Sequence, residues 1–374
     1  MNQLTLQPIT PEYDPWDPIR SLRKHGKHVL TSVELTTTHL CNMRCEHCAV
    51  GDALTTKEAA HLPLADILRM LDQVEHLETL SITGGEPSYD ALAVREYVLP
   101  LLKYARERGV RTQINSNLTM PINRYEMLAP WLDVMHISYN YRGAEDFWDI
   151  GFAKTTHTVS IGQATKMFDR MIDNVQALSA GGLYISAESM INYRTHEHLV
   201  EMHEAIVAMG CRRHEVHPMY PSAFAVNLPV LSLTQMRDTI HTLLDKRDPS
   251  IWMLFGTLPF FACSAVQEDR ELWRKLQQAV NVTVRNDPDG RNRLNVDTFS
   301  GKVSVTDFAE LTQIASIHEA PYELDRIFEQ WQRHEIYNRL NCYCEKANCC
   351  GPNLLVADTY YPDINFKSRT ALDK

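Results

Sequence analysis

Three cysteines that lie close together in this sequence could hold a metal cluster. Cys41, Cys45 and Cys48 follow a predicted strand in a C-x3-C-x2-C arrangement, and we call them the first cysteine group. Thiolates are the ligands of iron–sulfur clusters, and these three can bind one face of a cubane while one iron stays without a cysteine ligand. That iron is then open to a substrate or cofactor. A structural zinc site is the alternative, with His39 or His47 as its fourth ligand.

A glycine-rich turn follows the second predicted strand, residues 79–83. Gly84 and Gly85 let backbone groups approach a ligand closely, and Glu86 adds an acceptor for an ammonium group. By itself this Gly-Gly-Glu-Pro sequence would be an ordinary loop. Its position, one β/α unit after the first cysteine group, favours a second part of the same binding site.

A second cysteine group lies near the end of the sequence and contains Cys342, Cys344, Cys349 and Cys350, while Cys263 stands alone upstream. Disulfides are rare in a reducing compartment. Zinc is a credible metal for this group, because four thiolate ligands complete a tetrahedral site. An auxiliary iron–sulfur cluster is favoured, because the first cysteine group already implies that chemistry.

Alternating strand-like and helical segments must position these groups. Residues 1–27 form a proline-punctuated, irregular lead-in. Six consecutive β/α units predict a parallel sheet covered by helices, which right-handed crossovers curl into a partial barrel. The predicted strands are residues 33–38, 79–83, 110–115, 134–138, 183–191 and 213–218, and the helices are residues 64–77, 91–108, 123–131, 163–180 and 195–209.

The pattern changes after residue 221. Two helices, a β-hairpin and a last amphipathic helix are expected before the second cysteine group. We therefore predict an α/β protein with an N-terminal extension (1–30), a core barrel (31–225) and a smaller C-terminal α+β domain rich in cysteine (226–374). The predicted elements of the last domain are helices 234–246 and 267–280, hairpin strands 293–298 and 302–308, and helix 322–340.

With these motifs and units in place, the sequence resembles the radical SAM superfamily over about residues 33–218. In that family three cysteines hold a [4Fe–4S] cluster whose open iron binds the amine and carboxylate of S-adenosylmethionine. The resemblance implies a partial (β/α)6 TIM-like barrel. It also implies that Gly84, Gly85 and Glu86 bind the methionine amino group, and that Ser138, at the end of the fourth strand, lies near the cofactor.

The C-terminal region more loosely resembles the SPASM and twitch extensions of radical SAM enzymes, which hold auxiliary iron–sulfur clusters. Its C-x-C-x4-C spacing is similar to that of YfkAB-type proteins. The thiols present support one auxiliary [4Fe–4S] cluster. By resemblance, Cys342, Cys344 and Cys349 are its ligands with Cys263 as the fourth, and Cys350 is the alternative to Cys349.

The resemblance implies an enzyme that reductively cleaves S-adenosylmethionine to a 5′-deoxyadenosyl radical. The radical would start the oxidative modification of a peptide, a protein side chain or a small metabolite, with help from the auxiliary cluster. An electron donor such as flavodoxin or ferredoxin is implied, and no residue is assigned as a catalytic acid, base or hydrogen donor. The alternative is a non-catalytic iron–sulfur or zinc protein that acts in electron transfer or binding.

The amino-acid composition limits the kinds of partner that this protein can bind. Lys and Arg total 37 against 47 Asp and Glu, and the net charge of −10 opposes binding to nucleic acid. Residues 1–17 contain no apolar segment of a signal peptide. The uncharged stretches 217–236 and 249–267 are interrupted by proline and polar residues, so we expect neither to span a membrane. We expect a cytoplasmic protein.

Overall fold

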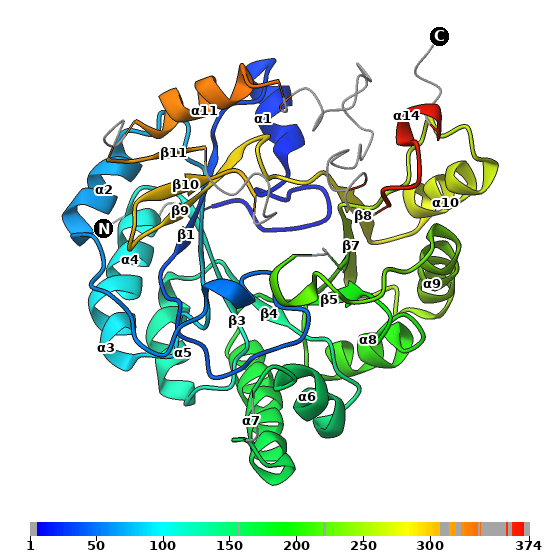
Figure 1. Cartoon of the computed structure of the whole chain (residues 1–374), viewed down its shortest axis with the longest axis horizontal. Helices are drawn as coiled ribbons and strands as arrows, with labels where there is room; N and C mark the ends of the chain where they lie inside the picture. The colour runs from blue at the N-terminus through cyan, green and yellow to red at the C-terminus, as the bar shows by residue number, and fades with distance from the viewer. Residues whose placement is uncertain are drawn as a thin grey trace.

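One large sheet organises the chain. In a computed structural model, the described residues form 11 strands in the order β11-β10-β9-β1-β2-β3-β4-β5-β6-β7-β8. The strands gather around the middle of the molecule and most helices surround them (Figure 1). The described residues are 6–155, 158–219, 222–306, 314–318, 323–335, 337, 357 and 361–369.

Six parallel neighbours form the barrel wall that the sequence predicts, and the expected α/β partial-barrel class is confirmed. The strands are β1 (Ser32–Thr36), β2 (Thr79–Thr83), β3 (Arg111–Ser116), β4 (Val134–Ser138), β5 (Ile185–Ile191) and β6 (Arg213–Pro218). The connecting elements are η1 (Gly51–Ala53), α2 (Leu64–Asp72), α3 (Ala91–Ala93), the π-helical η2 (Val94–Val98), α4 (Leu99–Glu107), α5 (Ile122–Leu128), η3 (Ala129–Trp131), α6 (Ala144–Gly151), α7 (Ile161–Ala180) and α8 (Leu199–Ala208).

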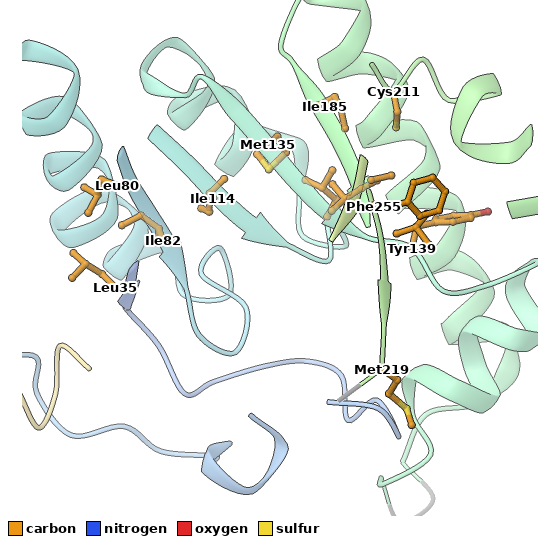
Figure 2. Close-up of a cluster of buried hydrophobic side chains, with 14 of the residues drawn as sticks. Leu35, Leu80, Ile82, Ile114, Met135, Tyr139, Ile185, Cys211, Met219 and Phe255 are labelled. Carbon is orange, nitrogen blue, oxygen red and sulfur yellow. The ribbon is translucent and has the colours of Figure 1, made fainter. Parts of the chain in front are cut away.

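These strands alternate apolar and polar residues, although parallel strands covered on both faces are usually apolar throughout. Leu35, Ile82 and Ile114 are fully buried members of the apolar core that Figure 2 shows. Their neighbours along the strands, such as Glu34 and Ser81, are also buried but lie on the other face of the sheet. The inside of the barrel is therefore polar, which suits a site for a charged ligand.

The sheet continues beyond the six predicted strands. β7 (Trp252–Gly256) and β8 (Val282–Arg285) add parallel strands beside β6, where we assigned no strand. At the opposite edge β9 (Arg293–Asp297) pairs in parallel with β1. The predicted hairpin is present as β9 and β10 (Lys302–Ser304), and β11 (Ala315–Ser316) follows. Residues 225 and 226, the predicted domain boundary, lie between two strands of one sheet.

The lead-in is more ordered than we predicted, because it contains helix α1 (Pro18–His25). Asp17 caps its start by accepting a hydrogen bond from the backbone N–H of Ile19, and Pro18 occupies the first turn. Gly26 ends the helix at φ 69°, a left-handed conformation that glycine adopts without strain. These capping signals were present in the sequence, and we interpreted them only as irregular structure.

Helix α10 (Gln267–Gln278) contacts β8 and helix α9 (Leu233–Lys246). Helix α11 (Leu324–Gln332) begins within the predicted segment 322–340, of which residues 322, 336 and 338–340 lie outside the described part. Among the described residues, no helix combines the length and apolar character needed to cross a membrane. The remaining elements are η4 (Ala223–Ala225), α9 (Leu233–Lys246), α10 (Gln267–Gln278), α11 (Leu324–Gln332) and α14 (Phe366–Arg369).

Candidate cofactor-binding site

The first cysteine group lies on a loop after β1, residues 37–50, which we call the cysteine loop. Helix α6, which the sequence analysis missed, holds this loop in place. The backbone N–H of Arg44 donates to Gly151 O at 2.9 Å, and that of Glu46 donates to Ile150 O at 3.0 Å. A Cβ at Gly151 would lie 2.5 Å from Met43 Cε, so glycine permits the close contact between loop and helix.

The three thiols lie near one another and are difficult to ionise without a metal. Burial raises the pKa of Cys45 well above its usual value, and the neighbouring Cys48 and Cys41 raise it further. Burial and Glu86 raise the pKa of Cys41 to about 12. Because thiols bind metals as thiolates, a cationic group must supply the compensating charge here.

The donor set fits an iron–sulfur cluster. Three cysteine side chains of one short loop can bind three irons of a cubane and leave the fourth iron open. Cys41, Cys45 and Cys48 are therefore compatible with an iron–sulfur cluster.

The glycine turn, residues 84–86, lies directly against the cysteine loop, as the strand order predicted. The backbone N–H of Gly85 donates to Thr38 O at 2.7 Å, and that of Glu86 donates to Leu40 O at 2.7 Å. A Cβ on Gly84 would lie 2.2 Å from Thr38 O, and a Cβ on Gly85 would lie 2.2 Å from Leu40 O. Gly84 also has φ 137°. Only glycine permits this approach of two backbones.

Glu86 is fully buried, and four uncharged donors surround its carboxylate. Oε1 accepts from Ser88 N at 3.0 Å, Ser88 Oγ at 2.5 Å and Ser116 Oγ at 2.8 Å. Oε2 accepts from Asn117 N at 2.7 Å. Burial raises the pKa of Glu86, and these hydrogen bonds oppose the rise. The side chain thus joins the glycine turn to the end of β3 and leaves Oε2 with a single described donor.

Other polar groups gather at the carboxyl ends of the strands. Ser138 ends β4 with an exposed side chain, in register with Glu188 of β5. Asn117 Nδ2 lies 3.9 Å from Cys41 Sγ, and Tyr141 Oη lies 3.9 Å from Cys45 Sγ. No motif in the sequence singles out Tyr141, because a tyrosine after a strand is not by itself a signal of a binding site.

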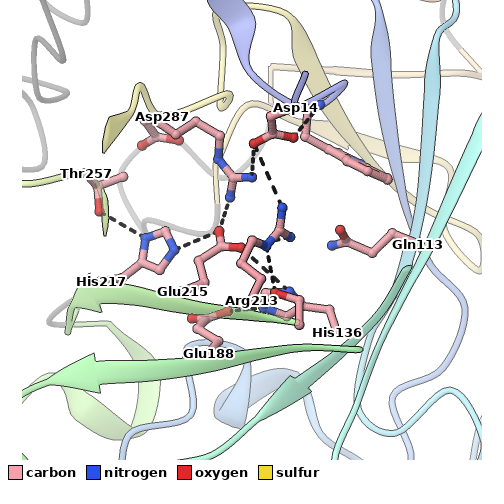
Figure 3. Close-up of polar contacts among 12 residues, drawn as sticks. Asp14, Gln113, His136, Glu188, Arg213, Glu215, His217, Thr257 and Asp287 are labelled. Atoms are coloured by element: carbon pink, nitrogen blue, oxygen red, sulfur yellow. Dashed lines mark hydrogen bonds and ion pairs between the residues drawn. The ribbon is translucent and has the colours of Figure 1, made fainter. Parts of the chain in front are cut away.

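The barrel interior also contains a network of buried charges that involves β6 and β8 (Figure 3). Glu215 of β6 accepts from Arg285 of β8, lies 3.1 Å from Arg213 Nη2, and lies 3.0 Å from His217 Nε2. Arg285 also pairs with Asp14 of the N-terminal segment at 3.1 Å. Burial alone would raise the pKa of Glu215, but Arg285 and Arg213 hold it well below its usual value.

Of the predicted ligands of a second cluster, Cys263 alone lies among the described residues. Cys263 lies half-buried after β7. Cys342, Cys344, Cys349 and Cys350 lie outside the described residues.

Two family models match this chain. The Radical SAM superfamily model matches residues 35–206, which contain the cysteine loop and the glycine turn. The YfkB-like domain model matches residues 219–371. A Bacillus subtilis (strain 168) relative named "Putative protein YfkA" is 51% identical over 367 residues and is aligned over 98% of each chain. The chain belongs to the radical SAM superfamily. Within that superfamily it is similar over nearly its whole length to the YfkAB-type proteins.

Solved structures share the fold at low sequence identity. Streptococcus suis SuiB bound to S-adenosylmethionine has a TM-score of 0.57 at 12% identity, covering 88% of this chain and 72% of that chain. SuiB bound to precursor peptide SuiA has a TM-score of 0.59 at 14% identity, covering 90% of this chain and 73% of that chain. The protein anSMEcpe with bound AdoMet and a Cp18Cys peptide has a TM-score of 0.54 at 11% identity, covering 89% and 96%. Superfamily membership makes this chain an enzyme of radical chemistry that uses S-adenosylmethionine and a [4Fe–4S] cluster.

Proposed function

We propose that this enzyme oxidatively modifies its substrate, after reductive cleavage of S-adenosylmethionine at the cysteine loop. The observation that carries the proposal is the direct backbone pairing of the glycine turn with that loop. When bound, the cluster supplies the electron for cleavage to a 5′-deoxyadenosyl radical. The cluster ligands in this proposal are Cys41, Cys45 and Cys48, and the cofactor-binding residues are Gly84, Gly85, Glu86 and Ser138.

The chain's own residues bind and orient a cationic ligand. S-adenosylmethionine carries a sulfonium and an ammonium group, and the buried carboxylate of Glu86 provides negative charge without a basic partner among the described residues. The tight glycine turn keeps side chains out of the space beside the loop. Ser138 supplies an exposed hydroxyl on the neighbouring wall. The thiols are half-buried in the cysteine loop, which limits the access of water to the reacting region.

The substrate in this proposal is a peptide, a protein side chain or a small metabolite. Support for a peptide comes from SuiB, which shares the fold and whose structure holds a precursor peptide. The cytoplasm suits the proposal, because a reducing compartment keeps the many cysteines as thiols. A small electron-transfer protein such as flavodoxin or ferredoxin would supply the reducing electron.

The proposed organisation is an N-terminal extension (1–30), a core (31–225) and a C-terminal region (226–374) with an auxiliary [4Fe–4S] cluster. Its ligands are Cys263, Cys342, Cys344 and Cys349, and the match of residues 219–371 to the YfkB-like domain supports a common unit that contains all four. The auxiliary cluster would bind the substrate or accept the electron left after hydrogen abstraction.

Cys45→Ala tests the first cluster. Two thiolates cannot hold a cubane with one iron open, so formation of 5′-deoxyadenosine by anaerobically reconstituted protein should stop. Cys211→Ala is the matched control, because Cys211 is buried outside both cysteine groups. Iron, sulfide and zinc analysis accompanies the assay. Cleavage by C45A, or bound zinc without cleavage in the wild type, would contradict the proposal.

Cys344→Ala tests the auxiliary cluster. The reconstituted variant should lose about four iron atoms, the content of one cubane, and keep the iron held by the first cysteine group. Cys263→Ala should give the same loss, whereas Cys350→Ala should not. An unchanged iron content in C344A would refute an auxiliary cluster, and an unchanged content in C263A alone would move the fourth ligand elsewhere.

A further inference from the structure

A cavity of about 300 Å³ lies between β1, β9 and the glycine turn. Glu34 and Thr36 line it from β1, and Gly84 and Gly85 form the side that it shares with the proposed cofactor site. Residues 49–54 of the cysteine loop and η1, together with residues 222–223, complete its lining. Its volume is at the lower end of the usual range for small-molecule sites, about 300–1,000 Å³.

Asn295 of β9 is the unusual group in this cavity. Its side chain lines the cavity and is 6% exposed, yet neither its Nδ2 nor its Oδ1 has a hydrogen-bond partner among the described residues. The strand register places Asn295 between Glu34 of β1 and Ser304 of β10, both of which also line the cavity. Because buried polar groups in proteins are normally paired, an unpaired donor and acceptor together indicate a missing ligand.

The polar atoms of Asn295 indicate which kind of ligand the cavity can bind. An anion would offer acceptors only and leave Oδ1 of Asn295 unpaired. A simple ammonium group would offer donors only and leave Nδ2 unpaired. An amide offers a donor and an acceptor, and one residue of an extended peptide presents its N–H and C=O on the same side.

We propose that this cavity binds an amide-containing part of the substrate, most simply one residue of an extended peptide, through Asn295 Nδ2 and Oδ1. The inference rests on the proposed function, since the cavity shares the glycine turn with the cofactor site. Asn295 is a specificity residue here: Nδ2 donates to the ligand carbonyl and Oδ1 accepts from the ligand N–H. Ser304, in register with Asn295, lies where it can contact a second polar group beside the amide.

The test uses two small probes and the reconstituted protein. N-acetyl-alanine N′-methylamide has both the N–H and the C=O of one residue, while 2-acetoxy-N-methylpropanamide replaces that N–H with an ester oxygen. Ligand-detected NMR titration should show that the wild type binds the first compound about 10-fold more tightly, the effect of one hydrogen bond. Propionamide, a primary amide, is the third probe. Tighter binding of propionamide than of the peptide probe would indicate that the cavity prefers a side-chain carboxamide to a peptide backbone.

Asn295→Leu should bind the two main probes within about two-fold of each other, because it removes both polar atoms. Leu294→Val is the matched control: Leu294 is buried on the other face of β9, so this variant should keep the 10-fold preference. A second measurement guards against misfolding. N295L should melt no lower than the wild type, because the substitution removes two unpaired buried polar atoms.

Equal binding of both probes by the wild type, no binding of either, or a preference that survives in N295L would each overturn the amide assignment. A crystal structure with the peptide probe that shows only water on Asn295 would do the same. Formation of 5′-deoxyadenosine by the wild type is measured separately on the same preparation. Selective amide binding without this product would refute the proposed function and leave the amide site standing, whereas product without selective binding would do the reverse.

Discussion

Two buried glutamates in different parts of the barrel are stabilised in opposite ways. Glu86, beside the cysteine loop, accepts four hydrogen bonds from uncharged groups of the described residues, and burial raises its pKa. Glu215, on β6, is surrounded by Arg285, Arg213 and His217, and its pKa is held well below the usual value. Both side chains are almost completely inaccessible to solvent.

This difference indicates that Glu215 has a structural role and that Glu86 can take part in binding. The charge of Glu215 is compensated by the chain itself, so this network holds β6, β8 and the N-terminal segment together. The charge of Glu86 is solvated by hydrogen-bond donors but is not cancelled by a described ion pair, so it can still attract a cation. A cationic cofactor supplies that missing charge in the proposed function.

The largest expected effect follows Glu215→Ala. This change leaves Arg213, which is 0% exposed, and Arg285 as buried charges without their main partner. The free energy of unfolding in urea should fall by about 3–5 kcal/mol, the usual result of breaking a buried ion pair. Glu215→Gln keeps the shape of the side chain, so the free energy of unfolding should fall by less in this variant. A loss below about 1 kcal/mol in E215A would show that the network does not hold these strands together.

A smaller loss of stability but a larger loss of cofactor affinity should follow Glu86→Gln. The amide keeps one acceptor and removes the charge, so S-adenosylmethionine should bind at least about 10-fold more weakly, or 1.4 kcal/mol. Stability should fall by about 1–3 kcal/mol, because Gln turns an NH₂ group toward existing donors. Equilibrium binding to the reconstituted protein measures the first effect. Unchanged affinity in E86Q, beside normal affinity in E215Q, would erase the contrast between the two glutamates.

The third prediction concerns two uncharged buried imidazoles, His203 and His214, whose Nδ1 atoms lie 3.0 Å apart. Asp248 N donates to His203 Nε2, so His203 Nδ1 carries the proton and donates to His214. Burial lowers the pKa of His203 to about 4. The unfolded chain therefore binds protons that the folded chain does not, and stability should fall as the pH drops from about 6.5 to 4.

Urea unfolding at several pH values measures that slope. His203→Gln keeps an acceptor for Asp248 N and a donor for His214, and it should flatten the dependence between these pH values. An equally steep slope in H203Q would assign the pH dependence to other groups.

Much of the barrel was predictable because its strands alternate in character. The six predicted strands of the core agree with β1–β6 to within about two residues at each end. Strand β7 was missed because residues 252–256 form a short apolar run without alternation, and β8 has only four residues. Helix α6 was missed although Glu145 and Asp146 occupy its first turn.

The contact between the glycine turn and the cysteine loop was predictable, because both follow the carboxyl ends of neighbouring parallel strands. Two other parts of the interior were not. Arg285 reaches Glu215 only because β8 extends the sheet, and Asn295 faces Glu34 only because β9 joins the free edge of β1. Such register depends on contacts between distant parts of the chain, which local patterns do not contain.

The pairing of β1 with β9 imposes an order on assembly during synthesis. Glu34 and Arg293, whose side chains form an ion pair across these two strands, are 259 positions apart. At about 5–20 residues per second, the outer edge of β1 stays unpaired for roughly 13–50 s after it is made. The first cysteine group emerges at the start of that interval, before η4, whose Phe224 N donates to Cys48 O. A nascent chain thus presents its thiols, and an open strand edge, well before the ribosome has made the parts that cover them.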